Sequence, residues 1–158
     1  MTRASVGKAK PALSLSVQYA SNAADLPTRP QLRRWVRAAL QANAVIAVRF
    51  VGAIEGRALN AQFRQKDYPT NVLTFVYDDQ DPRAGDIVLC TPVVQKEAHA
   101  QGKPLIAHYA HLVVHGMLHL QGYDHELAAD AATMEARETA ILAALGIPDP
   151  YASQVHLR

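Results

Sequence analysis

The chain lacks the features that mark exported and membrane-spanning proteins. It has one cysteine, Cys90, so no disulfide can form within the chain and the fold does not require an oxidising compartment. No apolar run approaches the roughly 18 residues that a membrane span needs. The N-terminal segment MTRASVGKAKPALSLSV is basic but has no continuous apolar stretch of the kind found in secretory signals. We therefore expect a cytoplasmic protein with no membrane partner.

A strong net charge is also missing. The formal charge of +2 is too small, by itself, to indicate nucleic-acid binding. Basic residues do gather locally in RPQLRRWVR, where a four-residue spacing would place Arg29, Arg33 and Arg37 on one side of a helix. This stripe is compatible with contacts to phosphate, and a solvent-exposed helix face explains it at least as well.

What is present is the composition of an ordinary globular protein, with 49% hydrophobic and 19% charged residues. We expect a flexible tail over residues 1–11 and a single domain over residues 12–158. Apolar patterning predicts strands, the last two as a hairpin, over 13–19, 44–51, 71–77 and 86–90. Proline, glycine and apolar spacing predict helices over 30–40, within 55–69, and over 91–102, 104–121 and 127–145. The fold class is therefore α/β (α+β), with a mixed four-stranded sheet packed with about five helices.

Histidine is concentrated in one short region. The chain has seven histidines, and five of them lie close together: His108, His111, His115, His119 and His125. Residues four apart project from the same side of a helix, so His115 and His119 can hold one ion. At about 1.5 Å of rise per residue, His111 and His119 are roughly 12 Å apart along the axis, too far to share an ion. Either His111 pairs with His115, or His115 pairs with His119.

Gly122 favours the second pairing, because it ends the helix and can turn the chain so that His125 supplies a third imidazole. Three nitrogen ligands with an open fourth position are typical of catalytic zinc, whereas structural zinc usually has four protein ligands and favours cysteine. The spacing therefore predicts one Zn²⁺ held by His115, His119 and His125. His111 is expected either to support a ligand by hydrogen bonding or simply to pack.

The same spacing, H-x-x-x-H-x-x-G-x-x-H, occurs in the metzincin proteases. Their motif has a glutamate directly after the first histidine, and that glutamate is the general base. Gly116 occupies the position here, so a protease mechanism lacks its proton acceptor. A metalloprotease is therefore disfavoured.

The segment HGMLHLQGYDH, preceded by LNAQFRQKDYPTNVLTF and GDIVLC, resembles the bacterial YbeY family of zinc-dependent endoribonucleases and rRNA maturation factors. The likeness runs from about the first strand to Ile147. It implies an α/β fold in which His115, His119 and His125 bind zinc beside a basic cleft. It also implies cleavage of single-stranded RNA, maturation of the 16S rRNA 3′ end and ribosome quality control. The implied partners are 16S rRNA, the small ribosomal subunit and its assembly factors.

The resemblance also assigns catalytic roles to Arg64 and His115. Arg64 matches the family's arginine before K-D-x-P-T, and a planar, permanently charged guanidinium suits phosphate. The alternative is an ion pair with a carboxylate such as Asp67. Asp124 can orient a ligand imidazole or cap the next helix. The chain departs from the family's frequent PTDVLSFP at Asn71, which puts an essential acid at that position in doubt.

Two chemistries are compatible with such a centre: attack by water activated at the metal, or attack by the RNA 2′-hydroxyl with the metal acting as a Lewis acid. In both, Arg64 offsets phosphate charge. The sequence does not identify the proton carrier, for which His111 and Asp124 are candidates. The competing function is a non-catalytic ribosome-assembly factor whose zinc only braces a helix turn.

Overall fold

Four strands form one mixed sheet in the computed structural model, which describes residues 10–123 and 127–152. The strands are β1 (Leu13–Ala20), β2 (Ala44–Val51), β3 (Val72–Asp78) and β4 (Arg83–Cys90). Their order is β1-β2-β4-β3, in which β1, β2 and β4 run parallel and β3 is antiparallel to β4. The predicted mixed sheet is therefore confirmed.

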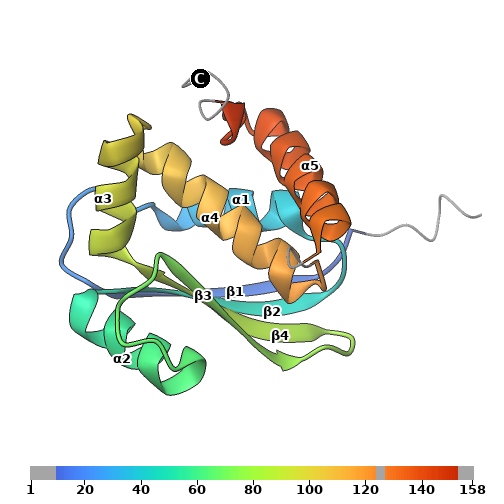
Figure 1. The fold of residues 1–158 in the computed structure, drawn as a ribbon. Coiled ribbons are helices and arrows are strands. Elements are labelled where there is room, and N and C mark those ends of the chain that lie inside the picture. The colour runs from blue at the N-terminus through green and yellow to red at the C-terminus, as the bar shows by residue number, and fades with distance from the viewer. Residues whose placement is uncertain (1–9, 124–126, 153–158) are drawn as a thin grey trace, which may run out of the picture.

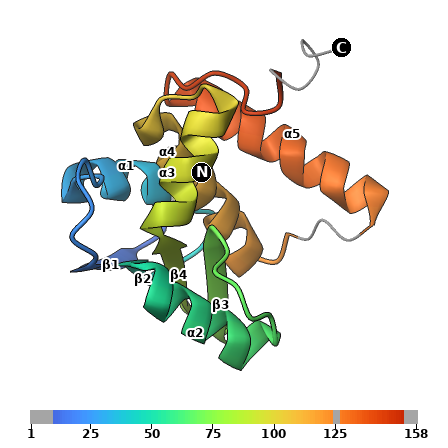
Figure 2. The ribbon, with the colours of Figure 1, turned by 60° about the vertical axis from the view of Figure 1, so that its left-hand side comes forward.

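Five helices, counted over the same residues, pack on this sheet. They are α1 (Arg29–Ala39), α2 (Ala53–Arg64), α3 (Thr91–Gln101), α4 (Leu105–Leu120) and α5 (Ala128–Ala144). Figures 1 and 2 show α2 alone on one face of the sheet and the other helices on the opposite face. The predicted element order and α/β class are confirmed. None of the helices in the described part reaches the length and apolarity that a bilayer crossing demands.

Helix α4 lies at the centre of the fold, where it packs against the sheet and against α1, α3 and α5. It is the most apolar helix, and side chains such as Val113, Met117 and Leu118 are fully buried. Gly116 allows a close approach to β4, because a Cβ at this position would lie 3.1 Å from Ile87 Cγ2. The apolar side of α4 is thus fixed against the sheet, which determines where its histidines point.

The end of α4 follows the sequence prediction. The helix ends at Leu120, and Gly122 has a φ of 100°, in the left-handed region that favours glycine. The N–H groups of Gly122 and Tyr123 then donate to the carbonyls of His119 and Leu118, both at 3.0 Å. The chain therefore leaves the helix direction within three residues of His119. The predicted tail over residues 1–11 lies mostly outside the described residues.

The hairpin of β3 and β4 is tighter than predicted. Strand β4 begins at Arg83 rather than at residue 86, because Gly85 pairs with Val76 and belongs to the ladder. Between the two predicted strands the sequence DDQDPRAG favours a turn throughout, since proline and glycine are typical of turns. Gly85 instead serves close packing, because an added Cβ would lie 2.6 Å from the Phe75 carbonyl oxygen.

Candidate active site

A cleft of about 620 Å³ opens between α2, β3 and the C-terminal half of α4. Helix α2 contributes Asn60 and Arg64 to its lining, and α4 contributes His115 and His119. Arg64 is the last residue of α2. Gln65 follows it in a left-handed conformation, with a φ of 59°, and turns the chain away from the helix. Two segments far apart in the sequence therefore bring the predicted arginine and two predicted metal ligands to one cleft.

The cleft has a cationic lining. Arg64 and Lys66 both line it, and the described lining residues include no carboxylate. Asp67, the alternative partner proposed for Arg64, instead accepts two hydrogen bonds from Arg57, at 2.8 and 3.0 Å. Among residues 10–123 and 127–152, Arg64 makes no ion pair. Such a lining attracts a polyanion such as RNA.

His115 and His119 lie on successive turns of α4, and their ring centroids are 4.7 Å apart at an interplanar angle of 82°. His119 Nδ1 donates to the Tyr123 carbonyl oxygen at 3.1 Å, because the carbonyl can only accept. His115 Nδ1 likewise donates to the carboxylate of Glu138. In both rings Nδ1 faces a protein oxygen, so a metal ion bound in the cleft would be ligated through Nε2. The pair thus fits a zinc centre with oriented imidazoles.

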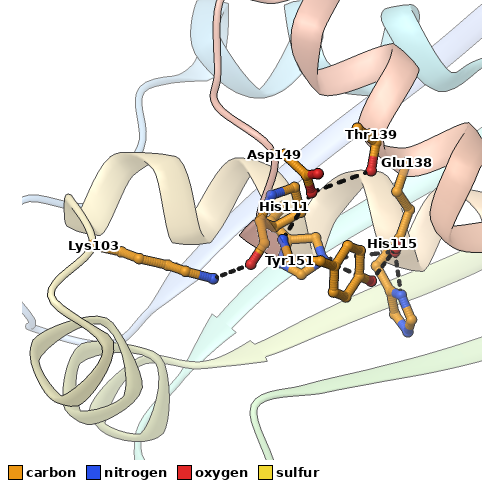
Figure 3. A network of polar contacts seen from close by, with 8 residues as sticks. Lys103, His111, His115, Glu138, Thr139, Asp149 and Tyr151 are labelled. Carbon is orange, nitrogen blue, oxygen red and sulfur yellow. Dashed lines mark hydrogen bonds and ion pairs between the residues drawn. The ribbon is translucent and has the colours of Figure 1, made fainter. Parts of the chain in front are cut away.

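Glu138 is the buried acid of the site. It lies on α5 with a fully buried side chain, contacts His115 and the Tyr151 hydroxyl, and lies 3.7 Å from His111 Nε2 (Figure 3). Burial opposes ionisation, but the hydrogen bonds from His115 and Tyr151, together with the nearby His111 ring, outweigh it and lower the pKa of Glu138 to about 2. Glu138 is therefore a carboxylate that accepts hydrogen bonds from two donors.

His111, His115 and Glu138 form a group that could hold a metal ion, since one ligand atom of each lies within 4.8 Å of the others. Two ligands of a tetrahedral zinc ion with bonds of about 2 Å would be roughly 3.3 Å apart. His115 Nδ1 and the Glu138 carboxylate are instead in direct hydrogen-bond contact. In this arrangement Glu138 is better placed to hydrogen-bond to a metal ligand, His115, than to bind the metal ion itself.

The other predicted site residues have different outcomes. His125 and Asp124 lie outside the described residues, so the third ligand and the role of Asp124 remain predictions. His111 Nε2 donates to the Tyr151 hydroxyl oxygen at 3.4 Å, because the hydrogen of that hydroxyl goes to Glu138, and the His111 ring lines a separate, largely apolar cavity formed with the segment 147–152. This position is compatible with the predicted role of His111 in supporting a metal ligand. It does not favour a role of His111 in proton transfer within the cleft.

Position 116 faces the sheet and not the cleft. An added Cβ there would meet three atoms of Ile87 between 3.1 and 3.3 Å. A glutamate at this point of α4 would point into the core against β4, away from the cleft that His115 and His119 line. The geometry thus gives a physical reason, beyond the missing carboxylate, to disfavour the protease mechanism.

Asn71 lines the cleft and is tied to a second acid. Its Nδ2 donates to Glu97 at 3.1 Å, and Glu97 lies 2.9 Å from His108 Nε2. The hydrogen bond with His108 lowers the pKa of Glu97 against burial, with Asn71 adding to the effect. A donor at position 71 therefore suits the neighbouring carboxylate.

Glu138 and Tyr151 are absent from the sequence-based set of site residues. One signal was available for Glu138: it lies at helical spacing from Met134, Ile141 and Leu142, on the buried face of α5. A charged residue on such a face needs a partner, because an unpaired buried charge is costly. Nothing in the local sequence indicates that the partner is His115.

The chain is similar to proteins of one family. A model described as endoribonuclease YbeY matches residues 17–146. The endoribonuclease YbeY of Aromatoleum aromaticum is 59% identical over 143 residues, covering 89% of this chain and 93% of the relative. That of Thiobacillus denitrificans is 59% identical over 145 residues, covering 90% and 99%. A solution structure from Thermotoga maritima aligns with a TM-score of 0.55 at 25% identity, covering 83% of this chain and 91% of that one.

Proposed function

The chain belongs to the YbeY family of endoribonucleases, and from this membership we propose that it is a zinc-dependent endoribonuclease specific for single-stranded RNA. Its proposed role is maturation of the 16S rRNA 3′ end and ribosome quality control in the cytoplasm. The proposed partners are the small ribosomal subunit and its assembly factors. The observation that supports the chemistry best is that Arg64, His115 and His119 line one cationic cleft.

The proposed zinc ligands are His115, His119 and, from the sequence spacing, His125. When bound, the ion supplies Lewis acidity toward a phosphate oxygen and lowers the pKa of a bound water. Glu138 and the Tyr123 carbonyl keep a proton on the Nδ1 atoms of His115 and His119. The protein thereby presents both rings in the tautomer that binds a metal through Nε2.

Arg64 binds the phosphate in this mechanism. Its guanidinium offsets the charge that develops on the phosphate oxygens, and Lys66 adds a second cation to the same lining. A single strand can enter a cleft of about 620 Å³ with its backbone against these cations. In a duplex the phosphates are held at fixed spacing, which hinders such insertion.

The direct test is incubation of zinc-loaded protein with one defined RNA, presented as a single strand and as a duplex, followed by mapping of the product ends. We expect cleavage of the single strand only, and none by folded His119→Ala. A 2′,3′-cyclic phosphate end identifies attack by the 2′-hydroxyl, whereas its absence under conditions that preserve it identifies attack by water. Equal cleavage by His119→Ala would remove the metal centre from the mechanism.

The cellular role has a separate test. Cells without the protein should accumulate 16S rRNA with an unprocessed 3′ end, and expression of His119→Ala should not correct this. If His119→Ala restores processing although it cleaves no RNA in vitro, the protein acts as a non-catalytic assembly factor instead.

A further inference from the structure

The carboxylate of Glu138 is buried in the core, although α5 also has solvent-exposed positions at which a carboxylate would keep its hydration. Its side chain is fully buried, and Met134, Ile141 and Leu142 surround it on the buried face of α5. Burying a carboxylate is unfavourable unless hydrogen-bond donors compensate it. The groups that contact Glu138 therefore indicate the role of this buried carboxylate.

Each Glu138 oxygen has a donor of its own. Oε2 accepts from His115 Nδ1, and Oε1 accepts from the Tyr151 hydroxyl (Figure 3). His111 Nε2 lies 3.7 Å from Oε2 and 3.4 Å from the Tyr151 hydroxyl. The carboxylate is thus held between α4 and the segment that follows α5, and it cannot rotate without losing one of two charge-assisted hydrogen bonds.

Tyr151 is itself anchored by the segment that carries it. The backbone N–H of Tyr151 donates to Asp149 Oδ1 at 2.8 Å, and Thr139 donates to the same oxygen at 3.4 Å. Lys103 Nζ donates to the Pro150 carbonyl at 2.9 Å, which ties the segment to the turn between α3 and α4. These anchors lie outside the cleft, so they can be varied without touching its lining.

We propose that Glu138 and Tyr151 are positioning residues of the metal centre: Tyr151 fixes the Glu138 carboxylate, and the carboxylate fixes the His115 ring with its proton on Nδ1. This inference rests on the proposed function, because it takes His115 as a metal ligand. His119 is oriented by a backbone carbonyl. His115 Nδ1 instead faces a carboxylate from another helix, Glu138 of α5.

The test is metal affinity, measured by titrating Zn²⁺ into the full-length apoprotein in competition with a chromophoric chelator. Glu138→Gln keeps the shape and an acceptor oxygen but removes the charge, and we expect Zn²⁺ binding weakened by about 10- to 100-fold. Tyr151→Phe removes one hydroxyl, and we expect a smaller loss in the same direction. Glu135→Gln is the matched control, since it removes the same charge from an exposed position of α5 and should bind Zn²⁺ as the wild type does.

A purely structural role for Glu138 makes a different prediction. It would change the melting temperature of the apoprotein and leave the Zn²⁺ affinity of the folded fraction unchanged, which would overturn the proposal. The visible spectrum of the Co²⁺-loaded protein gives an independent readout. We expect the ligand-field bands to shift in Glu138→Gln and in Tyr151→Phe, and not in Glu135→Gln.

His119→Ala separates this inference from the proposed function. Loss of Zn²⁺ binding in His119→Ala together with wild-type affinity in Glu138→Gln overturns the positioning role and leaves the proposed centre intact. Wild-type affinity in His119→Ala overturns the proposed centre. If His119→Ala retains Zn²⁺ while Glu138→Gln loses it, Glu138 is itself a ligand with His111 and His115, and the positioning role is wrong.

Discussion

At the scale of the residue, the two nitrogens of each imidazole have separate tasks. His115 and His119 both direct Nδ1 to a protein oxygen, which leaves metal ligation to Nε2. The sequence could predict this pair, because a spacing of four residues on a helix defines the geometry by itself. It could not predict Glu138, which lies 23 positions from His115 and meets it only after α5 packs on α4.

Arg64 gives the sharpest prediction at this scale. Arg64→Glu should leave the zinc content and the melting temperature nearly unchanged, because the side chain is exposed and lines the cleft without an ion pair among the described residues. RNA cleavage should fall by two or more decades, since an anion replaces the phosphate-binding cation. The measurement is the cleavage rate per folded, zinc-loaded molecule.

Two variants serve as comparisons for Arg64→Glu. Arg34→Glu makes the same charge change on an exposed position of α1 outside the Arg29, Arg33 and Arg37 stripe and should cleave RNA nearly as the wild type does. Arg64→Lys should be impaired, because an ammonium ion cannot reproduce the guanidinium fork. Near-wild-type cleavage by Arg64→Glu would remove Arg64 from the active site.

At the scale of the element, the register between α4 and the hairpin determines where the histidines point. Gly116 and Gly85 let α4 approach the sheet closely. Apolar periodicity predicted the helices and three of the strands to within a few residues, but the start of β4 was wrong. Glycine and proline next to a strand are typical of a turn, and only the pairing of Gly85 with Val76 shows that Gly85 lies in the ladder.

Gly85→Ala tests this close packing. An added Cβ would lie 2.6 Å from the Phe75 carbonyl oxygen and 2.7 Å from Leu120 Cδ2, and the backbone atom cannot move aside cheaply. We expect the free energy of unfolding to fall by about 1–3 kcal/mol, as in other overpacked cores. Urea denaturation measures it. Gly52→Ala is the control, because its Cβ would meet nothing within 4 Å; equal midpoints for the two variants would contradict the account.

At the scale of the whole molecule, an apolar core of buried side chains packs around α4. Side chains of α1, β2, β4, α4 and α5 form one buried cluster. Hydrophobic patterning predicted the order of the elements and the mixed sheet. It could not predict the cleft, because the lining comes from α2, β3 and α4, whose relative placement depends on long-range packing.

Removal of zinc should therefore lower stability without unfolding the protein. A ligand that binds only the folded state stabilises it by RT ln(1 + [L]/Kd), so a chelator should lower the melting temperature. The far-ultraviolet circular dichroism at 25 °C should stay that of the folded chain. Unfolding on chelation would instead indicate a structural metal, as in a non-catalytic assembly factor.

The central claim is that RNA cleavage occurs at the metal centre of the cleft. The most direct measurement is titration of Zn²⁺ into the apoprotein while the initial rate of cleavage of one single-stranded RNA is recorded. We predict that the rate rises from background in proportion to added zinc and stops rising at one equivalent per chain, and that His119→Ala stays at background throughout. Full cleavage by the apoprotein, or wild-type cleavage by His119→Ala, would contradict the account.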